Sequence, residues 1–262
     1  MIRYLNIFFI CFKRSFIRDM TFKANFIIRF FTDAIYLFVF IIYFSILFTK
    51  VPEIAGWSKY EMIMLLGTFH IIVSIFTSLF FPNLASIPAH VKNGSLDGLL
   101  KMPIDTQFVL SINNIDTGST TNIILGLAFV IRAVIALNLN VDAVQIVNFI
   151  FFLFIGVGIL YCTFFTVLMT SFWLQEGSWC ISLFMTLYGF ADKPMSIYKG
   201  LVGRIFMYLI PYALIANIPS GVLLNKDIQN YKLLAIMSLV LFFLLGRYLW
   251  KKGLKRYEGA SI

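Results

Sequence analysis

The residues that could carry chemistry are ionisable side chains inside long apolar segments. Such side chains are costly to place in hydrocarbon, so each one marks a candidate functional position. Arg29 and Asp33 are four residues apart on one helical face, where they can neutralise each other as a structural pair. Arg132 has no such neighbour and is expected to face the protein interior, toward Asp116 or Glu176. It could contact an anionic group there or brace two helices, and bracing is the simpler interpretation.

His70 is the remaining ionisable candidate, in the middle of an apolar segment. Its imidazole could titrate near neutral pH. A single histidine among Phe and Ile is more often a hydrogen-bonded core residue. The chain has only two histidines, and its cysteines form no metal-ligand pattern, so a metal site is not expected.

The motifs of hydrolases and nucleotide-binding proteins are absent from the sequence. There is no Gly-x-Ser-x-Gly, no His-Glu-x-x-His and no spaced pair of aspartates in neighbouring spans, so an enzyme is not expected. There is also no Gly-x-x-x-x-Gly-Lys-[Ser/Thr] phosphate loop. The chain is therefore expected to bind no cofactor, and any ATP-driven work must come from a partner.

Composition and charge place these residues in a membrane protein. Hydrophobic residues make up 60% of the 262, whereas 13% are charged. Eleven of the 21 basic residues lie in two end segments, at Arg3, Lys13, Arg14, Arg18, Lys23 and Arg29 and at Arg247, Lys251, Lys252, Lys255 and Arg256. Cytoplasmic flanks of membrane spans collect Lys and Arg, so both termini are expected in the cytoplasm. An anionic lipid surface explains the net charge of +9, and no nucleic acid partner is expected.

The fold class expected is an all-α integral membrane protein with six transmembrane helices. A bilayer takes about 20 apolar residues to cross. The predicted spans are 24–48, 61–81, 105–137, 144–168, 179–190 and 233–250, with 105–137 as one long tilted helix. Residues 1–20 are expected to form an amphipathic helix that lies in the membrane interface, with phenylalanines on one face and basic residues on the other.

Residues 191–226 allow two interpretations. Pro194, Pro211 and Pro219 interrupt this apolar stretch. A full span here would give seven crossings and place the basic C-terminus outside. A re-entrant hairpin on the external side gives six and keeps both ends inside, and it is tolerated where protein buries it. We expect the hairpin.

The segment 83–103, between spans two and three, is expected to be cytoplasmic. Ser86 and Ser95 are expected to cap two short helices there, and Asn93-Gly94 and Pro103 to end them. Exposed Val91, Leu96, Leu99 and Leu100 beside charged residues could fill an apolar groove on a partner. An ordinary interfacial loop is the alternative.

Seven short motifs spread along the chain resemble the permease subunits of ABC-2 type exporters, in particular a bacterial family of unassigned substrate. They are IAGWS at 54–58, EM at 61–62, LLG at 65–67, GSLDGLLKMP at 94–103, KPMSIY at 193–198, IPYA at 210–213 and RYEGAS at 256–261. The resemblance covers nearly the whole chain, and each motif alone is loose.

The resemblance implies a six-span subunit of the bacterial cytoplasmic membrane, paired with a second permease that is identical or homologous. Two cytoplasmic ATPase subunits would bind ATP-Mg. The segment 83–103 would carry a coupling helix that docks on the ATPase. The residues expected to dock are Val91, Lys92, Gly94, Leu96, Asp97, Leu99, Leu100, Lys101 and Pro103.

Three function classes remain open at this point. The leading one is an ATP-driven exporter whose pathway lies at the dimer interface and whose substrate is lipid-like or amphipathic. The second is an ion-gradient-driven transporter or channel, which would usually show acidic residues or broken helices at the midplane and inverted repeats. The third is a noncatalytic assembly or immunity factor that only recruits a partner.

Overall fold

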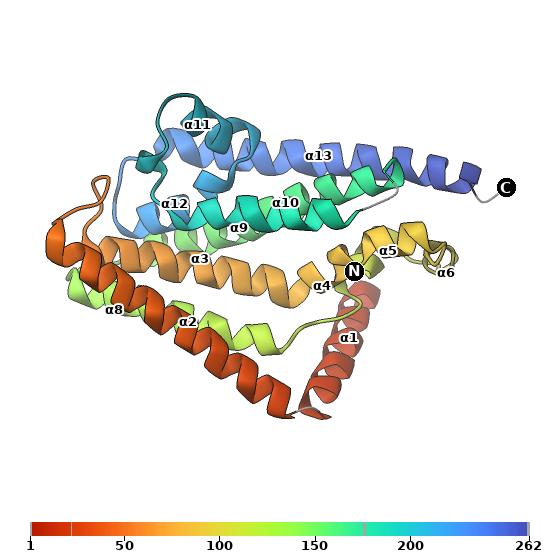
Figure 1. Cartoon of the computed structure of the whole chain (residues 1–262), viewed down its shortest axis with the longest axis horizontal. Coiled ribbons are helices and arrows are strands. Elements are labelled where there is room, and N and C mark those ends of the chain that lie inside the picture. The colour runs from red at the N-terminus through yellow and green to blue at the C-terminus, as the bar shows by residue number, and fades with distance from the viewer. Residues whose placement is uncertain (1, 22, 175–176, 261–262) are drawn as a thin grey trace.

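The computed structural model describes residues 2–21, 23–174 and 177–260. Within these ranges the regular structure is helical and no strand occurs, so the all-α prediction is confirmed. In chain order the helices are α1 (Ile2–Thr21), α2 (Lys23–Lys50), α3 (Lys59–Leu79), α4 (Phe81–Ala85), α5 (Ile87–Lys92), α6 (Leu96–Leu100), α7 (Thr106–Ile112), α8 (Thr121–Ala136), α9 (Ala143–Leu168), α10 (Ser178–Tyr188), α11 (Gly200–Arg204), α12 (Tyr212–Leu223) and α13 (Gln229–Ala260). Most of the long helices run along the long axis of the molecule, and α1 crosses them at one end (Figure 1).

Four helical stretches in the described ranges are long and apolar enough to cross a membrane. They are Lys59–Leu79, Gly118–Ala136, Ala143–Phe172 and Gln229–Tyr257. A bent pair, Gly200–Leu209 with Tyr212–Leu223, makes a fifth if it is counted as one span. The first predicted span, 24–48, lies in α2, which includes the shorter apolar stretch Ile41–Lys50. The fifth predicted span, 179–190, lies mainly in α10, whose 11 residues reach roughly 16 Å. The six-span topology therefore stays a prediction.

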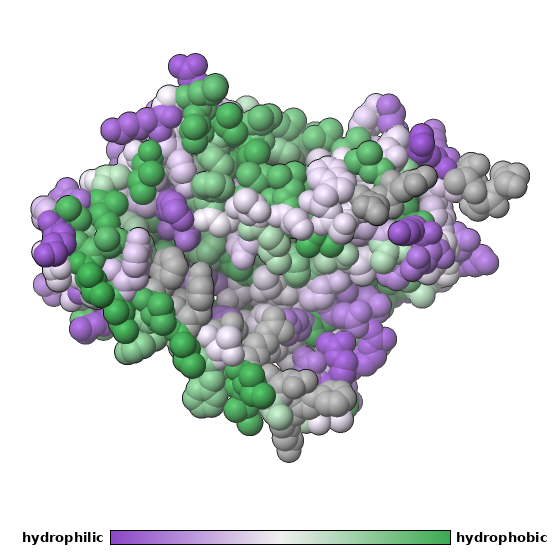
Figure 2. Space-filling view, viewed as in Figure 1, coloured by the Kyte–Doolittle hydropathy of each residue, from purple (hydrophilic) through white to green (hydrophobic). Residues whose placement is uncertain are grey.

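Hydrophobic side chains follow α2 and cover much of the surface over α13, and hydrophilic ones gather at the two ends of the view (Figure 2). The exposed apolar residues include Ile124 on α8, Phe154 on α9 and Leu241 on α13. In water such a surface would drive association, whereas in a bilayer it meets lipid chains. The distribution agrees with a membrane-embedded bundle.

Helices α3 and α8 pack closely against each other through two glycines. A Cβ placed on Gly67 would lie 2.8 Å from the Gly126 carbonyl oxygen and 2.8 Å from Phe129 Cβ. A Cβ on Gly126 would lie 2.8 Å from the Gly67 carbonyl oxygen. Small residues let membrane helices approach backbone to backbone in this way. Glycine at both positions is what allows α3 and α8 to meet.

Helix α12 is the buried centre of the segment predicted as a hairpin. All of its residues from Tyr212 to Leu223 are buried, and it packs against α9 and α3. The preceding bend of 83° falls at Ile210–Pro211, where Pro211 was expected to interrupt the helix. Pro219 was also expected to interrupt it, and this was wrong, because Pro219 lies inside α12. The surrounding helices hold α12 in place despite the backbone hydrogen bond that proline removes.

The turn around Pro194 is fixed by the same helix. The Asn217 side chain donates to the Lys193 carbonyl at 2.8 Å and accepts from the Met195 backbone N–H at 2.9 Å. The buried amide thus satisfies a backbone donor and a backbone acceptor on either side of Pro194. The bend between Leu209 and Tyr212 is compatible with a re-entrant segment, and the re-entrant hairpin stays a prediction.

The prediction of one continuous helix over 105–137 was wrong. Helix α7 ends at Ile112, and α8 begins only at Thr121. Four consecutive backbone N–H groups in the break donate to other parts of the chain instead of to a helical carbonyl: Asn114 to Asn83 Oδ1 (2.7 Å), Ile115 to Ser15 Oγ (2.9 Å), Asp116 to the Ser78 carbonyl (2.8 Å) and Thr117 to Asp19 Oδ2 (3.1 Å). Because these external partners satisfy the backbone, the helix can stay broken.

Candidate functional site

The helix pair α5–α6 and its flanks carry all the residues expected to dock on a partner. Lys92, Gly94, Asp97, Lys101 and Pro103 are exposed, and Val91, Leu99 and Leu100 are half-buried. The pair lies at the same end of the molecule as α1 and the end of α13 (Figure 1). Two positive charges and one negative charge therefore surround a small apolar surface at one end of the bundle.

Leu96 was expected to be exposed, and this was wrong. Its exposed fraction is 0%, and it belongs to the core cluster together with Leu84 and Ile87. A helix of five residues makes only about one and a half turns, so few of its residues can face the protein. At least one of these must be apolar if the helix is to pack against the core. Leu96 is this anchor, which leaves Leu99 and Leu100 as the accessible leucines of α6.

The serines before these two helices do not cap them through their side chains as expected. Ser86 Oγ donates to the Asn83 carbonyl at 2.6 Å, and Ser95 Oγ pairs with His90 Nδ1 at 2.8 Å. The second contact links the end of α5 to the start of α6. Gly94, between them, has a φ of +70°, which glycine adopts without strain. The turn between α5 and α6 is thus specified by local contacts.

Asn83, in α4, ties the helix pair to the break between α7 and α8. Its amide nitrogen donates to the Ser111 carbonyl at 3.1 Å and to the Asn114 carbonyl at 2.6 Å. Its amide oxygen accepts from the Asn114 backbone N–H at 2.7 Å. Asn83 is 2% exposed, so these bonds replace water that it cannot reach. A displacement of α4 and α5 would therefore strain the break.

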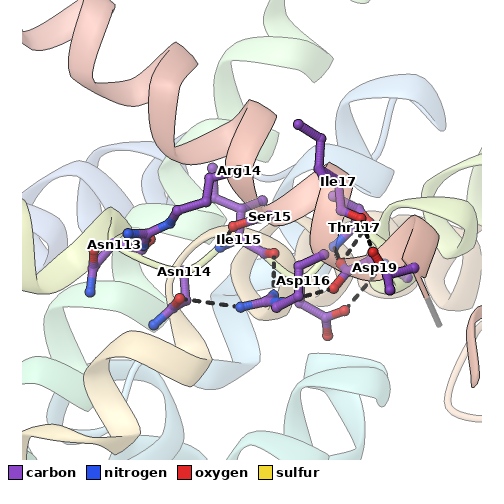
Figure 3. Close-up of polar contacts among 12 residues, drawn as sticks. Arg14, Ser15, Ile17, Asp19, Asn113, Asn114, Ile115, Asp116 and Thr117 are labelled. Carbon is purple, nitrogen blue, oxygen red and sulfur yellow. Dashed lines mark hydrogen bonds and ion pairs between the residues drawn. The ribbon is translucent and has the colours of Figure 1, made fainter.

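Helix α1 holds the break from the other side (Figure 3). Arg14 donates to the Asn113 carbonyl at 2.7 Å, and Arg18 donates to the Ile115 carbonyl at 3.3 Å. The Asp19 carboxylate accepts from Thr117 Oγ1 at 2.7 Å and from the Thr117 backbone N–H. We call Arg14, Ser15, Arg18 and Asp19 with residues 113–117 the α1 clamp.

The polar face of α1 packs inward in this clamp, and its aromatic face points outward. Ser15 is 1% exposed, whereas Phe9 is 63% and Phe16 is 47% exposed. A soluble protein would bury the aromatic face instead. This inverted arrangement suits a helix whose outer face meets lipid.

The electrostatics of the clamp centre on Asp19. Burial raises the pKa of this carboxyl, but the hydrogen bonds from Thr117 and Arg18 and the positive charge of Arg18 outweigh burial and hold the pKa below its ordinary value. A lowered pKa means that the ionised form is stabilised in the folded protein. The stabilisation is complete at neutral pH, and it is lost as the pH falls below the ordinary value of about 3.9 toward the lowered one.

We expect the substitution Asp19→Asn to loosen α1 without unfolding the bundle. The substitution replaces a charged hydrogen-bond acceptor by a neutral amide. Hydrogen bonds to a charged group contribute about 1.5–3 kcal/mol each to folding stability, and less where solvent reaches them. Hydrogen–deuterium exchange should rise in residues 113–120 and in α1. Asp227→Asn, at an exposed carboxylate outside the clamp, is the matched control and should leave exchange there unchanged. Equal exchange in both variants would contradict the role given to Asp19.

The structure does not bring the expected interior residues together as one site. Asp116 is in the break, where its carboxylate accepts from the Gly118 N–H at 3.2 Å and from Ser119 Oγ at 2.9 Å. Arg132 was expected to face the interior, and this was wrong, because it is exposed on α8. Its long side chain can extend along the helix toward a polar region. Glu176 lies outside the described residues.

His70 is a partly buried residue of α3. Its Nδ1 lies 3.0 Å from the Leu66 carbonyl, one turn earlier in the same helix. This is the geometry of a hydrogen-bonded core histidine. Among the described residues, no group of three or more His, Cys, Asp or Glu side chains is placed to hold a metal ion.

Sequence reasoning missed Asn83 and the α1 clamp. The available signal was the run of polar residues from Ser111 to Asn122 inside an otherwise apolar span, which implies backbone or side chains that need partners. The partners could not be identified, because Ser15 and Asp19 lie about a hundred residues away in sequence.

A comparison with protein families matches most of the chain. The family model described as "ABC-2 family transporter protein" matches residues 34–261. The match includes the greater part of α2 and the whole of α3 to α13, and it leaves out α1. No curated protein and no solved structure matches the chain.

Proposed function

The chain belongs to the ABC-2 transporter family, and from this premise we propose that it is the permease subunit of an ATP-driven exporter. The family makes it a multi-pass membrane protein with a role in transport and in association with ABC ATPases. In our proposal the ATPase partners bind ATP-Mg and hydrolyse it, because this sequence lacks a phosphate loop. The membrane is the bacterial cytoplasmic membrane, with both termini in the cytoplasm.

The observation that carries this proposal is the anchored helix pair α5–α6. Leu96 fixes α6 to the core, while Leu99 and Leu100 remain accessible beside Lys92, Asp97 and Lys101. An apolar centre with a charged rim is the usual composition of a protein interface. We assign Val91, Lys92, Gly94, Asp97, Leu99, Leu100, Lys101 and Pro103 to the contact with the ATPase, and Leu96 to the support of that contact.

The proposed pathway lies between two permease subunits, identical or homologous. ATP binding would draw the two α5–α6 pairs together and shift the dimer between two packings. Asn83 supports this coupling, because it joins α4 to the break that precedes α8. The exposed apolar residues of several helices would meet either lipid or the second subunit. A pathway lined by such apolar residues would suit a lipid-like or amphipathic substrate.

The experiment that tests this proposal is purification of the tagged protein from its native membranes in mild detergent. We expect a soluble ATPase at one copy per permease chain, together with a dimer of permease subunits. A second, different permease in the sample would show a heterodimer. A single-component oligomer without ATPase, active in proteoliposomes without ATP, would instead support a gradient-driven transporter. Tight binding of a partner without transport or ATP hydrolysis would support a noncatalytic recruitment factor.

A further inference from the structure

A cavity of about 670 Å³ lies within the single subunit, among helices α3, α7, α9 and α13, with Phe8 of α1 also in its wall. This volume is in the range of small-molecule sites, about 300–1,000 Å³. Residues of one chain form the cavity by themselves, so an inference about it does not rest on the proposed pathway between two subunits. Most of its wall is apolar, with Ile75, Leu79, Phe154, Val157 and Phe243.

One region of the wall is polar and internally bonded. Arg247 of α13 donates to Gln107 Oε1 at 2.6 Å and to Asp105 Oδ2 at 3.3 Å. The Tyr161 hydroxyl is 3.1 Å from Gln107 Nε2 and 2.8 Å from Ser111 Oγ. These five side chains come from α7 and its N-terminal flank, from α9 and from α13. The cavity therefore has an apolar part and a polar part, as a site for an amphiphile requires.

The charge of the polar part is balanced. Among the residues that line the cavity, Arg247 and Asp105 carry the charges, one positive and one negative. Their side chains are 37% and 41% exposed, so both can contact a ligand. A phosphate accepts hydrogen bonds from a guanidinium, and a primary ammonium donates them to a carboxylate. A headgroup with both charges adds one opposite charge to each partner of this ion pair. A purely anionic headgroup would add a negative charge beside Asp105 and bring no positive charge to offset it.

The position of the polar part matches the orientation of a lipid. Arg247 stands at the end of the apolar stretch of α13, just before the basic residues Lys251 and Lys252. Along α9 the wall runs from Tyr161 back to Phe154, seven residues or roughly 10 Å deeper in the apolar region. A headgroup at Arg247 would thus lie at the membrane boundary, with its acyl chain directed toward the hydrocarbon.

We propose that this cavity binds one phospholipid with a zwitterionic headgroup. The phosphate lies at Arg247, the ammonium at Asp105, and an acyl chain lies against Leu79, Val157 and Phe154. Gln107 orients the guanidinium, and Tyr161 and Ser111 complete the polar wall. The site belongs to each subunit by itself.

Native mass spectrometry of the full chain, delipidated in detergent and titrated with phosphatidylethanolamine or with phosphatidylglycerol of the same acyl chains, tests the proposal. Wild type should bind one phosphatidylethanolamine per chain and bind phosphatidylglycerol at least tenfold more weakly. Arg247→Gln removes the phosphate partner, and Leu79→Trp fills the apolar part while leaving the polar side chains intact. Both should weaken phosphatidylethanolamine binding at least tenfold. Lys251→Gln removes a neighbouring charge outside the cavity and should bind as wild type does.

If either Arg247→Gln or Leu79→Trp folds poorly, the other variant still tests the proposal. Elution as a single symmetric peak in size-exclusion chromatography shows which variants are folded, and Leu79→Trp disturbs no hydrogen bond of the polar part. Equal affinity for the two lipids would overturn the zwitterionic assignment. Unchanged phosphatidylethanolamine binding in a folded Leu79→Trp or Arg247→Gln variant would overturn the site.

Discussion

Replacing Leu99 and Leu100 together by Asp is expected to abolish stable association with the ATPase. Both side chains are half-buried on α6, next to the buried anchor Leu96. A carboxylate forced into an apolar contact loses water without gaining a partner, which costs several kcal/mol. We expect the ATPase to be retained at least about 100-fold less strongly, equivalent to about 2.8 kcal/mol. The measurement is a titration of purified ATPase against the permease in detergent.

The control for this variant adds the same charge to the same segment. Asn93→Asp with Met102→Asp introduces two carboxylates at exposed positions around α6 and leaves both leucines in place. This control should bind the ATPase within about threefold of wild type. Equal loss in the two variants would mean that net charge, and not the leucine contact, governs binding. Normal binding by the Leu99/Leu100 variant would refute the docking assignment.

The substitution Gly67→Val is expected to prevent α3 and α8 from packing. A Cβ at this position meets the Gly126 carbonyl oxygen at 2.8 Å and the Val130 backbone nitrogen at 3.1 Å. Backbone atoms cannot move aside as a flexible side chain can, so the helices must separate. Overpacking costs about 1–3 kcal/mol in ordinary cores, and we expect a loss of at least about 3 kcal/mol here. The measurement is the fraction of monodisperse protein after heating in detergent.

The matched control for the helix contact is Gly189→Val. A Cβ at Gly189 has no other heavy atom within 4 Å, so the added side chain meets open space. We expect this variant to keep the thermal stability of wild type within about 1 kcal/mol. A Gly67→Val protein as stable as this control would show that α3 and α8 do not cross as closely as described.

The sequence allowed prediction of the elements that depend on local composition. The apolar segments at 61–81 and 144–168 correspond closely to α3 and α9, because burial of about 20 apolar residues in a bilayer leaves helix as the stable form. The two short helices between 86 and 101 were also expected, because serine, Asn-Gly and proline mark helix ends locally.

What could not be predicted depends on contacts between distant residues. The break after Ile112 exists because Ser15, Ser78, Asn83 and Asp19 bind its backbone, and no local pattern reveals those partners. The burial of Leu96 likewise depends on which face of a five-residue helix meets the core. Arg132 was assigned to the interior from its charge alone, but a long side chain on a membrane helix can also extend to a polar boundary.

The most direct test of the coupling role is photo-crosslinking from α6. A benzophenone amino acid placed at exposed Lys101 should form an adduct with the ATPase in native membranes. The same amino acid at Asn140, in the loop between α8 and α9 and also exposed, is the control. Our account predicts an adduct from position 101 and none from position 140. An adduct from position 140 alone, or no adduct from position 101 when the ATPase is present, would contradict the assignment of α5–α6 as the site that couples this permease to ATP hydrolysis.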